Sequence, residues 1–328
     1  MHSCPICQTD LVGRSLESAT RHVESHWTID LTQDSTPAPA QPARTLSHIY
    51  DALSVQVAGM LPPQRIWLCA PHVECTSSTR RDRHWTCGYR NTQTLLSALI
   101  PQDPQLAARL QRCVPTIRQL QQALELAWRQ GHDPVGASQL GHRVVNTQKW
   151  IGPTEVYCIL QALQVNAQLI DFHRPTGSQG SHPALVRFVE RYYTGQLPIL
   201  PHHGESALAL LNSPCLTTPL HDTTLPIQWT NLPPLYWQHA GHSRVIIGVE
   251  YVNTAATHLL VYDPEVPIER YHQSLTAADA LLALVRVPIA QLAAHQQYQL
   301  LMVWSDADPP SPSAVSGDLR GFRLCRVP

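Results

Sequence analysis

The sequence predicts an α+β fold, because segments with helical spacing come first along the chain and segments typical of strands come mostly later. Apolar residues three and four apart predict five helices, at 91–100, 104–113, 117–130, 153–164 and 182–193. Short β-branched or aromatic segments bounded by turn residues predict four strands, at 167–173, 243–252, 258–264 and 297–305. We expect these strands to form a mainly antiparallel sheet.

Composition divides the 328 residues into four parts. Residues 1–28 are compact and contain Cys and His, whereas 29–45 are rich in Pro, Ala, Thr and Gln without apolar periodicity, which indicates a linker. Apolar segments alternate with turns over 46–305, the expected main domain. Residues 306–328 are expected to be a tail.

The bulk composition argues against several classes of protein. The net charge is −1 and charged residues make up 14% of the chain, so overall charge favours neither a nucleic-acid nor a membrane partner. No apolar run approaches the ~18 residues of a membrane span, and the N-terminus lacks the regions of a signal peptide. Nine cysteines without a disulfide-like rhythm favour reduced thiols. We therefore expect a soluble monomer in the cytoplasm, the nucleus or both, with no membrane partner.

The first part contains a candidate zinc site. Cys4 and Cys7 are followed, after fourteen residues, by His22 and His26, which lie one helical turn apart. Two thiolates and two imidazoles suit tetrahedral Zn²⁺, and a segment this short could not hold together without metal. We expect a C2H2-type zinc finger with structural Zn²⁺.

The partner of this finger is less directly indicated. A finger that reads DNA usually belongs to an array and carries basic residues at its base-reading positions. This finger is single and nearly neutral. The sequence therefore favours a protein partner over nucleic acid.

Cys87 is the candidate nucleophile. It stands at or just before the start of an apolar helix, where unpaired amides and the helix dipole lower the pKa of a thiol from ~8.5. Papain-like thiol peptidases have this arrangement, with their His and Asn or Asp much later in the chain. Taken alone, the segment fits a buried structural cysteine equally well.

Two downstream residues favour the catalytic interpretation. His242 begins an apolar strand, and Asp263 follows the next strand 21 residues later. A hairpin of these two strands would set the imidazole beside the carboxylate. Cys, His and Asp then occur in papain-like order, with Asp orienting the imidazole and His activating the thiol.

Five sequence blocks carry a resemblance to a known family. They read CGYRNTQTLLSAL, DPVGASQLGH, TQKWIGPTEVYCILQALQVNAQLIDFH, PPLYWQHAGHSRVIIGVE and LLVYDPEVP, in this order. Together they resemble the zinc-finger-containing ubiquitin peptidase family, over roughly residues 46–305. The resemblance implies a papain-like cysteine peptidase domain without a catalytic cofactor, in which Cys87 is the nucleophile, His242 the base and Asp263 the orienting acid.

The resemblance also implies a substrate. The ubiquitin tail ends in Leu-Arg-Leu-Arg-Gly-Gly, and Asp133 and Glu155 match acidic positions of the family that contact its arginines. The alternative roles are a helix N-cap for Asp133 and a first-turn helix acid for Glu155. Trp150 stands where an aromatic residue would wall the glycine tunnel or pack the core, and we expect it to support the wall rather than contact ubiquitin.

The resemblance therefore predicts a deubiquitinase that acts through a thioester intermediate and prefers lysine-63-linked polyubiquitin. Relatives that act on the ubiquitin-fold modifier usually place Asp and His in one Asp-Pro-His motif, whereas Glu265 follows Asp263-Pro264 here, which favours ubiquitin. Those proteases are the first alternative. A catalytically silent adaptor that binds ubiquitin or nucleic acid is the alternative of another class. The second donor to the oxyanion stays unassigned.

Overall fold

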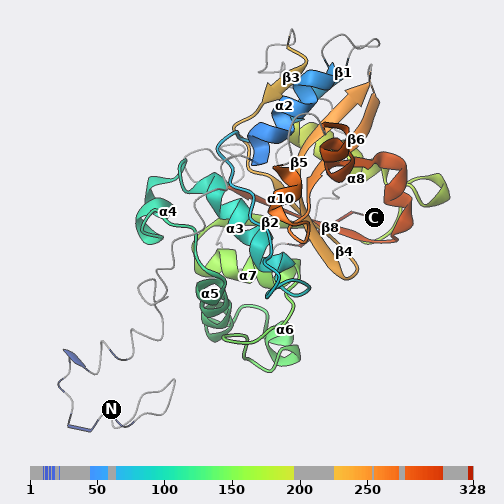
Figure 1. Cartoon of the computed structure of the whole chain (residues 1–328). Helices are drawn as coiled ribbons and strands as arrows, with labels where there is room; N and C mark the ends of the chain where they lie inside the picture. Colours follow the sequence, from blue (N-terminus) through green and yellow to red (C-terminus); the bar gives the residue numbers. More distant parts are fainter. Residues whose placement is uncertain are drawn as a thin grey trace.

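Figure 1 shows the computed structural model of the chain. The structure describes residues 45–57, 64–195, 225–252, 255–272, 278–305 and 324–327, together with a few positions before residue 23. The described helices are α2 (Thr45–Val57), α3 (Cys87–Leu99), α4 (Pro104–Arg109), α5 (Ile117–Arg129), α6 (Pro134–Gln139), α7 (Pro153–Ala162), α8 (Pro183–Tyr193), α10 (Ile268–Tyr271) and α11 (Ala278–Val285), with short 3-10 helices at η2 (Ser178–Gly180) and η4 (Ile289–Ala294). The strands are β1 (Gln64–Leu68), β2 (Asn166–Phe172), β3 (Ile227–Trp229), β4 (Leu235–His239), β5 (His242–Val252), β6 (Ala255–Tyr262), β7 (Arg286–Pro288), β8 (Tyr298–Trp304) and β9 (Leu324–Val327).

One mixed sheet joins these strands, in the order β3-β1-β5-β4-β8-β2-β9 with β6 and β7 branching from β5. The long strand β5 makes the branch possible: its first half pairs with β4, its second half pairs with β1, and β6 runs along its other edge. Only β1 with β3 and β2 with β9 pair in parallel within the described chain. The α+β class and the mainly antiparallel sheet are therefore as the sequence predicts.

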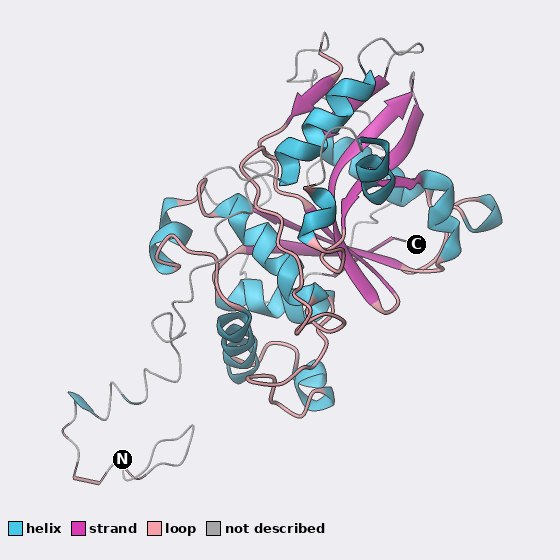
Figure 2. Cartoon of the chain, viewed as in Figure 1, coloured by secondary structure: helices cyan, strands magenta, loops and turns pink. Residues whose placement is uncertain are grey.

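Helices cover both faces of the sheet, and each face has its own apolar core (Figure 2). Strand β4 shows why, since Tyr236 packs with α3, α5 and α7 while Leu235 and Trp237 pack on the other face with α2, α8 and α11. The same alternation along β2 and β8 gives both faces apolar side chains. Helix α3, which begins at the candidate nucleophile Cys87, thus lies on one face, against β4 and β5.

The chain differs from the sequence-based prediction at its end. Residues 324–327 fall in the expected tail, yet they form β9 and pair in parallel with β2. A four-residue strand carries too little local pattern to reveal a partner about 150 residues earlier. No helix in the described parts of the chain is long and apolar enough to cross a membrane.

A buried ion cluster fixes the middle of β5. Glu250 is 1% exposed and accepts two hydrogen bonds of 2.7 and 2.6 Å from Arg286. His258 Nδ1 lies 3.2 Å from Glu250 Oε2, the oxygen that accepts from Arg286 Nε. Burial would raise the pKa of Glu250, but the hydrogen bonds from His258 and Arg286 lower it below its usual value. The carboxylate therefore stabilises the fold at neutral pH and loses this effect as acid protonates it.

Glu250→Gln is expected to destabilise the fold by about 3 kcal/mol, because it leaves the Arg286 guanidinium without its buried counter-charge. Urea unfolding at neutral pH measures the change. Glu269→Gln, on the exposed side of α10, is the matched control and should cost little. Equal stability of the two variants would show that the cluster contributes nothing.

Candidate active site

Cys87 is the first residue of α3 and its side chain is 6% exposed. The helix start is held by close packing, since a Cβ at Gly88 would lie 2.8 Å from the carbonyl oxygen of Ile151. Glycine is required for this approach. Thr86 precedes the helix, and its hydroxyl donates to the carbonyl oxygen of Asp82 at 2.7 Å. These contacts place the thiol where the helix N-terminus favours an anion.

His242 and Asp263 lie side by side at the ends of neighbouring strands. Strand β5 begins at His242, β6 ends at Tyr262, and the pairing of Val245 with Tyr262 brings Asp263 next to the start of β5. His242 Nε2 lies 3.0 and 2.9 Å from the two carboxylate oxygens of Asp263. The structure thus contains the contact expected from the hairpin.

Cys87 lies close enough to His242 and Ser243 for both residues to lower the pKa of its thiol. Since Asp263 occupies Nε2 of His242, Nδ1 is the ring nitrogen left for the thiol. Ser243 contacts Cys87 through both its hydroxyl and its backbone, and its hydroxyl accepts a hydrogen bond of 3.0 Å from Asn91 Nδ2. Asn91 lies one turn along α3, so this bond ties the helix to the strand that carries His242.

The thiol and the imidazole shift the pKa values of each other. Burial alone would raise the pKa of Cys87, but hydrogen bonds from His242 and Ser243 lower it below its usual value. Burial opposes a charge on His242, yet its hydrogen bonds to Asp263 and Cys87 raise its pKa to about 9. Burial would raise the pKa of Asp263, but its hydrogen bond with His242 lowers that pKa below its usual value. At any pH between the lowered pKa of Cys87 and the raised pKa of His242, the site therefore favours a thiolate beside an imidazolium.

Gln238 lies on the sheet face that Cys87 approaches. It pairs in register with Ser243, so the two side chains share a face. Tyr236 Oη donates to Gln238 Oε1 at 2.9 Å, which directs the amide Nε2 away from Tyr236. That Nε2 would lie 3.5 Å from a Cβ at Gly152. The amide Nε2 of Gln238 thus lies near the Gly152 backbone, at the start of α7.

Asp133 and Glu155 converge at Gly136. A Cβ at Gly136 would clash with Asp133 Oδ2 and lie 3.1 Å from Glu155 Oε1. One oxygen of each carboxylate caps a helix, because Asp133 Oδ1 accepts from the Gly136 N–H at 3.0 Å and Glu155 Oε2 accepts from the Gly152 N–H at 2.7 Å. Asp133 Oδ2 is buried and has no partner in the described part of the chain. Both structural roles are therefore present, and each carboxylate keeps a second oxygen.

Trp150 lies on the surface, two residues before Gly152, with 53% of its side chain exposed. This differs from the expectation that it supports the tunnel wall from the core. An aromatic residue before Gly-Pro fits either position, so the local sequence does not separate them. Val135, beside Asp133, is also exposed, at 66%. Two apolar side chains are thus available near the two carboxylates.

The predicted zinc ligands Cys4, Cys7 and His26 lie outside the described residues, and His22 is described without them. Among the described residues, no group of three or more His, Cys, Asp and Glu side chains could hold a metal ion. The zinc finger therefore remains a prediction from the sequence.

The sequence-based prediction does not include Ser243, Asn91 and Gln238. A weak signal exists for two of them, because Ser243 directly follows His242 and Gln238 precedes it by four residues, both as polar residues in mostly apolar segments. Asn91 lies on the buried face of α3, where a polar side chain needs a partner. Its partner, Ser243 on β5, lies 152 residues later in the chain and can be identified only from the folded structure.

Comparisons with known proteins agree on one family. Residues 63–301 match peptidase family C78. The chain is 37% identical over 243 residues to zinc finger-containing ubiquitin peptidase 1 of Homo sapiens, covering 73% of this chain and 37% of that protein. The Macaca fascicularis protein of the same name is 35% identical over 81% of this chain and 42% of its own length.

A more distant relative is ubiquitin carboxyl-terminal hydrolase mug105 of Schizosaccharomyces pombe, which is 34% identical over 56% of this chain and 61% of its own length. The solved structure of UfSP from C. elegans aligns with a TM-score of 0.42 and 15% identity, over 78% of this chain and 37% of that chain. This chain spans less than half the length of the two mammalian relatives.

Proposed function

Because the chain belongs to peptidase family C78, we propose that it is a papain-like cysteine peptidase that hydrolyses isopeptide bonds at the C-terminus of ubiquitin. The contact of Cys87 with His242, and of His242 with Asp263, is the observation that carries this proposal. The named relatives support ubiquitin as the substrate, since both names refer to ubiquitin.

The proposed reaction proceeds in two halves. The proton of Cys87 resides on Nδ1 of His242, and the thiolate attacks the carbonyl carbon of the last glycine of ubiquitin. The carbonyl oxygen becomes an oxyanion, which the Cys87 backbone N–H and Gln238 Nε2 stabilise. The C–N bond breaks as His242 gives its proton to the leaving lysine amine, and a thioester remains. Neutral His242 then takes a proton from water, the hydroxide attacks the thioester, and Cys87 leaves as a thiolate.

The ubiquitin tail is proposed to lie along α6 and the start of α7. Asp133 and Glu155 each keep one oxygen that a tail arginine could bind, and the buried, unpartnered Oδ2 of Asp133 suits a guanidinium donor. Exposed Trp150 and Val135 offer apolar contacts for the two leucines of the tail. We therefore propose a contact role for Trp150.

Replacing the carboxylates by their amides separates the binding role from the capping role. Asn accepts the Gly136 hydrogen bond and tolerates the left-handed backbone of Asp133, and Gln accepts the Gly152 bond, so Asp133→Asn and Glu155→Gln keep both caps. Each should lower kcat/KM for a ubiquitin–fluorophore substrate about tenfold, mainly through KM, with unchanged Tm. Asp133→Arg and Glu155→Arg should lower it further, because they place like charges together.

Unchanged kcat/KM in both amide variants would assign these carboxylates to helix capping alone. The matched control is Glu269→Gln, which removes an exposed carboxylate far along the chain on α10. It is expected to leave both kcat/KM and Tm unaltered.

Residues 1–28 are proposed to form a zinc finger that binds a further ubiquitin unit of a chain, with 29–45 as its linker. Deleting 1–28 should leave turnover of a single-ubiquitin substrate intact and lower cleavage of long chains about tenfold or more, because a tethered second site raises effective concentration. Cys4→Ser with Cys7→Ser should reproduce the deletion by abolishing Zn²⁺ binding. Equal losses on both substrates would instead make the finger part of the catalytic fold, and binding of DNA without ubiquitin would reject the avidity role.

We also propose, from the sequence, that the protein prefers lysine-63-linked polyubiquitin, is a monomer, and is located in the cytoplasm, the nucleus or both. A panel of linkage-defined di-ubiquitins tests the preference. A protease of the ubiquitin-fold modifier and a catalytically silent adaptor are the alternatives, and activity on ubiquitin substrates decides against both.

A further inference from the structure

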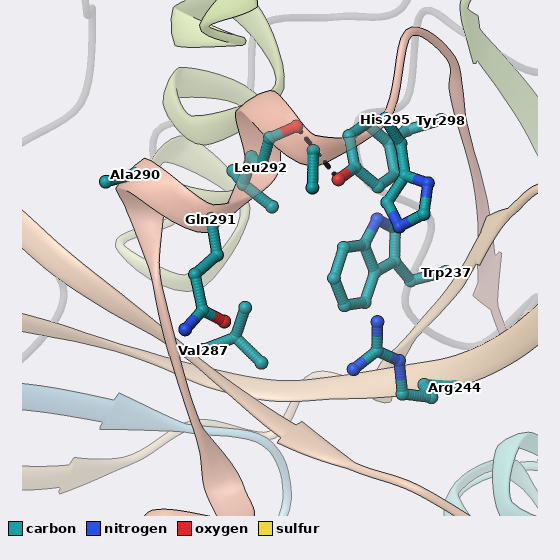
Figure 3. A pocket seen from close by; sticks show the side chains of 9 residues that line it. Trp237, Arg244, Val287, Ala290, Gln291, Leu292, His295 and Tyr298 are labelled. Carbon is teal, nitrogen blue, oxygen red and sulfur yellow. Dashed lines mark hydrogen bonds between the residues drawn. The ribbon is translucent and has the colours of Figure 1, made fainter.

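A cavity of about 290 Å³ lies on the face of the sheet that carries His242. Strands β4, β5, β7 and β8 and the short helix η4 surround it (Figure 3). Trp237 pairs in register with Arg244, as His239 does with His242, so these four side chains share one face. Apart from Arg244, Gln291, His295 and Tyr298, the lining is aliphatic or aromatic.

Arg244 is the only permanently charged residue that lines the cavity. Its guanidinium points into the cavity and faces the Trp237 ring, with Cζ 4.5 Å from the ring centroid (Figure 3). One of its nitrogens, Nη2, lies 3.1 Å from His239 Nε2, while Nε is buried and has no partner in the described part of the chain. No ion pair among the described residues includes Arg244. Asp263 acts on the Arg244 charge from outside the lining, and no carboxylate lines the cavity itself. A half-buried cation thus faces a small space in which nothing pairs with it directly.

The lining restricts the ligand that would complete this site. A planar guanidinium with a free edge matches the two oxygens of a carboxylate. A dianionic phosphate would require further cations, and only the imidazole of His295, stacked on His239 at 4.0 Å, could supply one. The walls of Val287 and Leu292 suit an aliphatic or aromatic stem. We infer that this cavity binds a carboxylate carried on a short apolar stem, with Arg244 as its ionic partner.

The site lies close to His242, on the face of the sheet opposite α3. Arg244 is two residues from His242 on the same face of β5, and the ring of His239 lies 6.2 Å from that of His242 and stacks on His295. The carboxylate has two sources: a free small acid, or an acidic side chain beside the acceptor lysine of the substrate. The second source rests on the proposed isopeptidase function, whereas the binding site itself does not.

The direct test titrates the full chain with 3-phenylpropionate and, in parallel, with its neutral isostere 3-phenylpropionamide. We expect a Kd of about 1 mM or tighter for the acid, and binding about tenfold weaker for the amide. Gln291→Glu places a like charge on an exposed residue of the cavity wall and should weaken the acid about tenfold. Gln296→Glu, exposed and outside the lining, is the matched control and should bind as the unaltered chain does.

Arg244→Gln should abolish the preference for the acid over the amide. If Arg244→Gln fails to fold, Gln291→Glu still tests the inference.

A second arm compares two ubiquitin–lysine peptides that carry Glu or Gln beside the isopeptide-linked lysine. Faster turnover of the Glu peptide, lost in Gln291→Glu, identifies the substrate as the source, and equal turnover with intact acid binding identifies a free acid. Equal binding of acid and amide, or no effect of Gln291→Glu on either arm, overturns the inference. Ubiquitin–fluorophore turnover, which involves no peptide leaving group, reports separately on the proposed function.

Discussion

Cys87→Ala is expected to lower turnover of a ubiquitin–fluorophore substrate by about 10⁴-fold or more, because it removes the atom that forms the thioester. The side chain is small and lies at the start of α3, so the fold should persist. The rate of fluorophore release, measured with excess enzyme, gives the loss, and Tm shows that the variant is folded.

The matched control for this variant is Cys113→Ala. Cys113 is an exposed free cysteine, so its removal costs no packing and should leave the rate unchanged. Residual turnover by Cys87→Ala that iodoacetamide abolishes would show that another thiol is the nucleophile. If Cys87→Ala lowered the Tm as well as the rate, Cys87 would have a structural role.

His242→Ala is expected to lower kcat/KM about 10³-fold, because the thiol loses its proton acceptor and the leaving amine loses its proton donor. The pH profile adds a sharper test. Since the pKa of His242 is raised to about 9, the rate of the unaltered chain should fall as pH rises through this value and the imidazolium loses its proton.

Asp263→Asn provides the matched comparison for that profile. The amide can still accept the hydrogen bond from His242 Nε2, but it lacks the charge that raises the imidazole pKa. The descending limb should therefore move below pH 9, with a smaller loss of rate than in His242→Ala. A limb at the same pH in both the unaltered chain and Asp263→Asn would contradict the assigned pair.

The sequence predicts the contact between His242 and Asp263, and the helix-start position of Cys87, because each residue has a strong local signal. Cys87 stands before an apolar helix, and the predicted hairpin requires His242 and Asp263 to meet, as the pairing of Val245 with Tyr262 shows. Gln238 has only a weak signal, its polar side chain in a mostly apolar segment. Its position depends on β4 pairing with β5 in one register, and the bond from Tyr236 that orients its amide exists only in the folded sheet.

The sequence also predicts Asp133 and Glu155 as a pair only through family resemblance. Their convergence at Gly136 follows from the packing of α6 near α7, which no periodicity along the chain encodes. The exposure of Trp150 depends on the same packing. Long-range strand pairing escapes prediction for a similar reason, because β9 pairs with β2 although about 150 residues, including six other described strands, lie between them.

The central claim is that Cys87 takes the C-terminal carbonyl of ubiquitin as an acyl group. The most direct measurement incubates the full chain with ubiquitin that carries a C-terminal electrophile, and separately with the ubiquitin-fold modifier bearing the same electrophile. Intact-mass spectrometry and peptide mapping then locate the bond. The account predicts one ubiquitin adduct, on Cys87, and none with the modifier. A ubiquitin adduct on any other cysteine, no ubiquitin adduct at all, or an adduct with the modifier alone would contradict it.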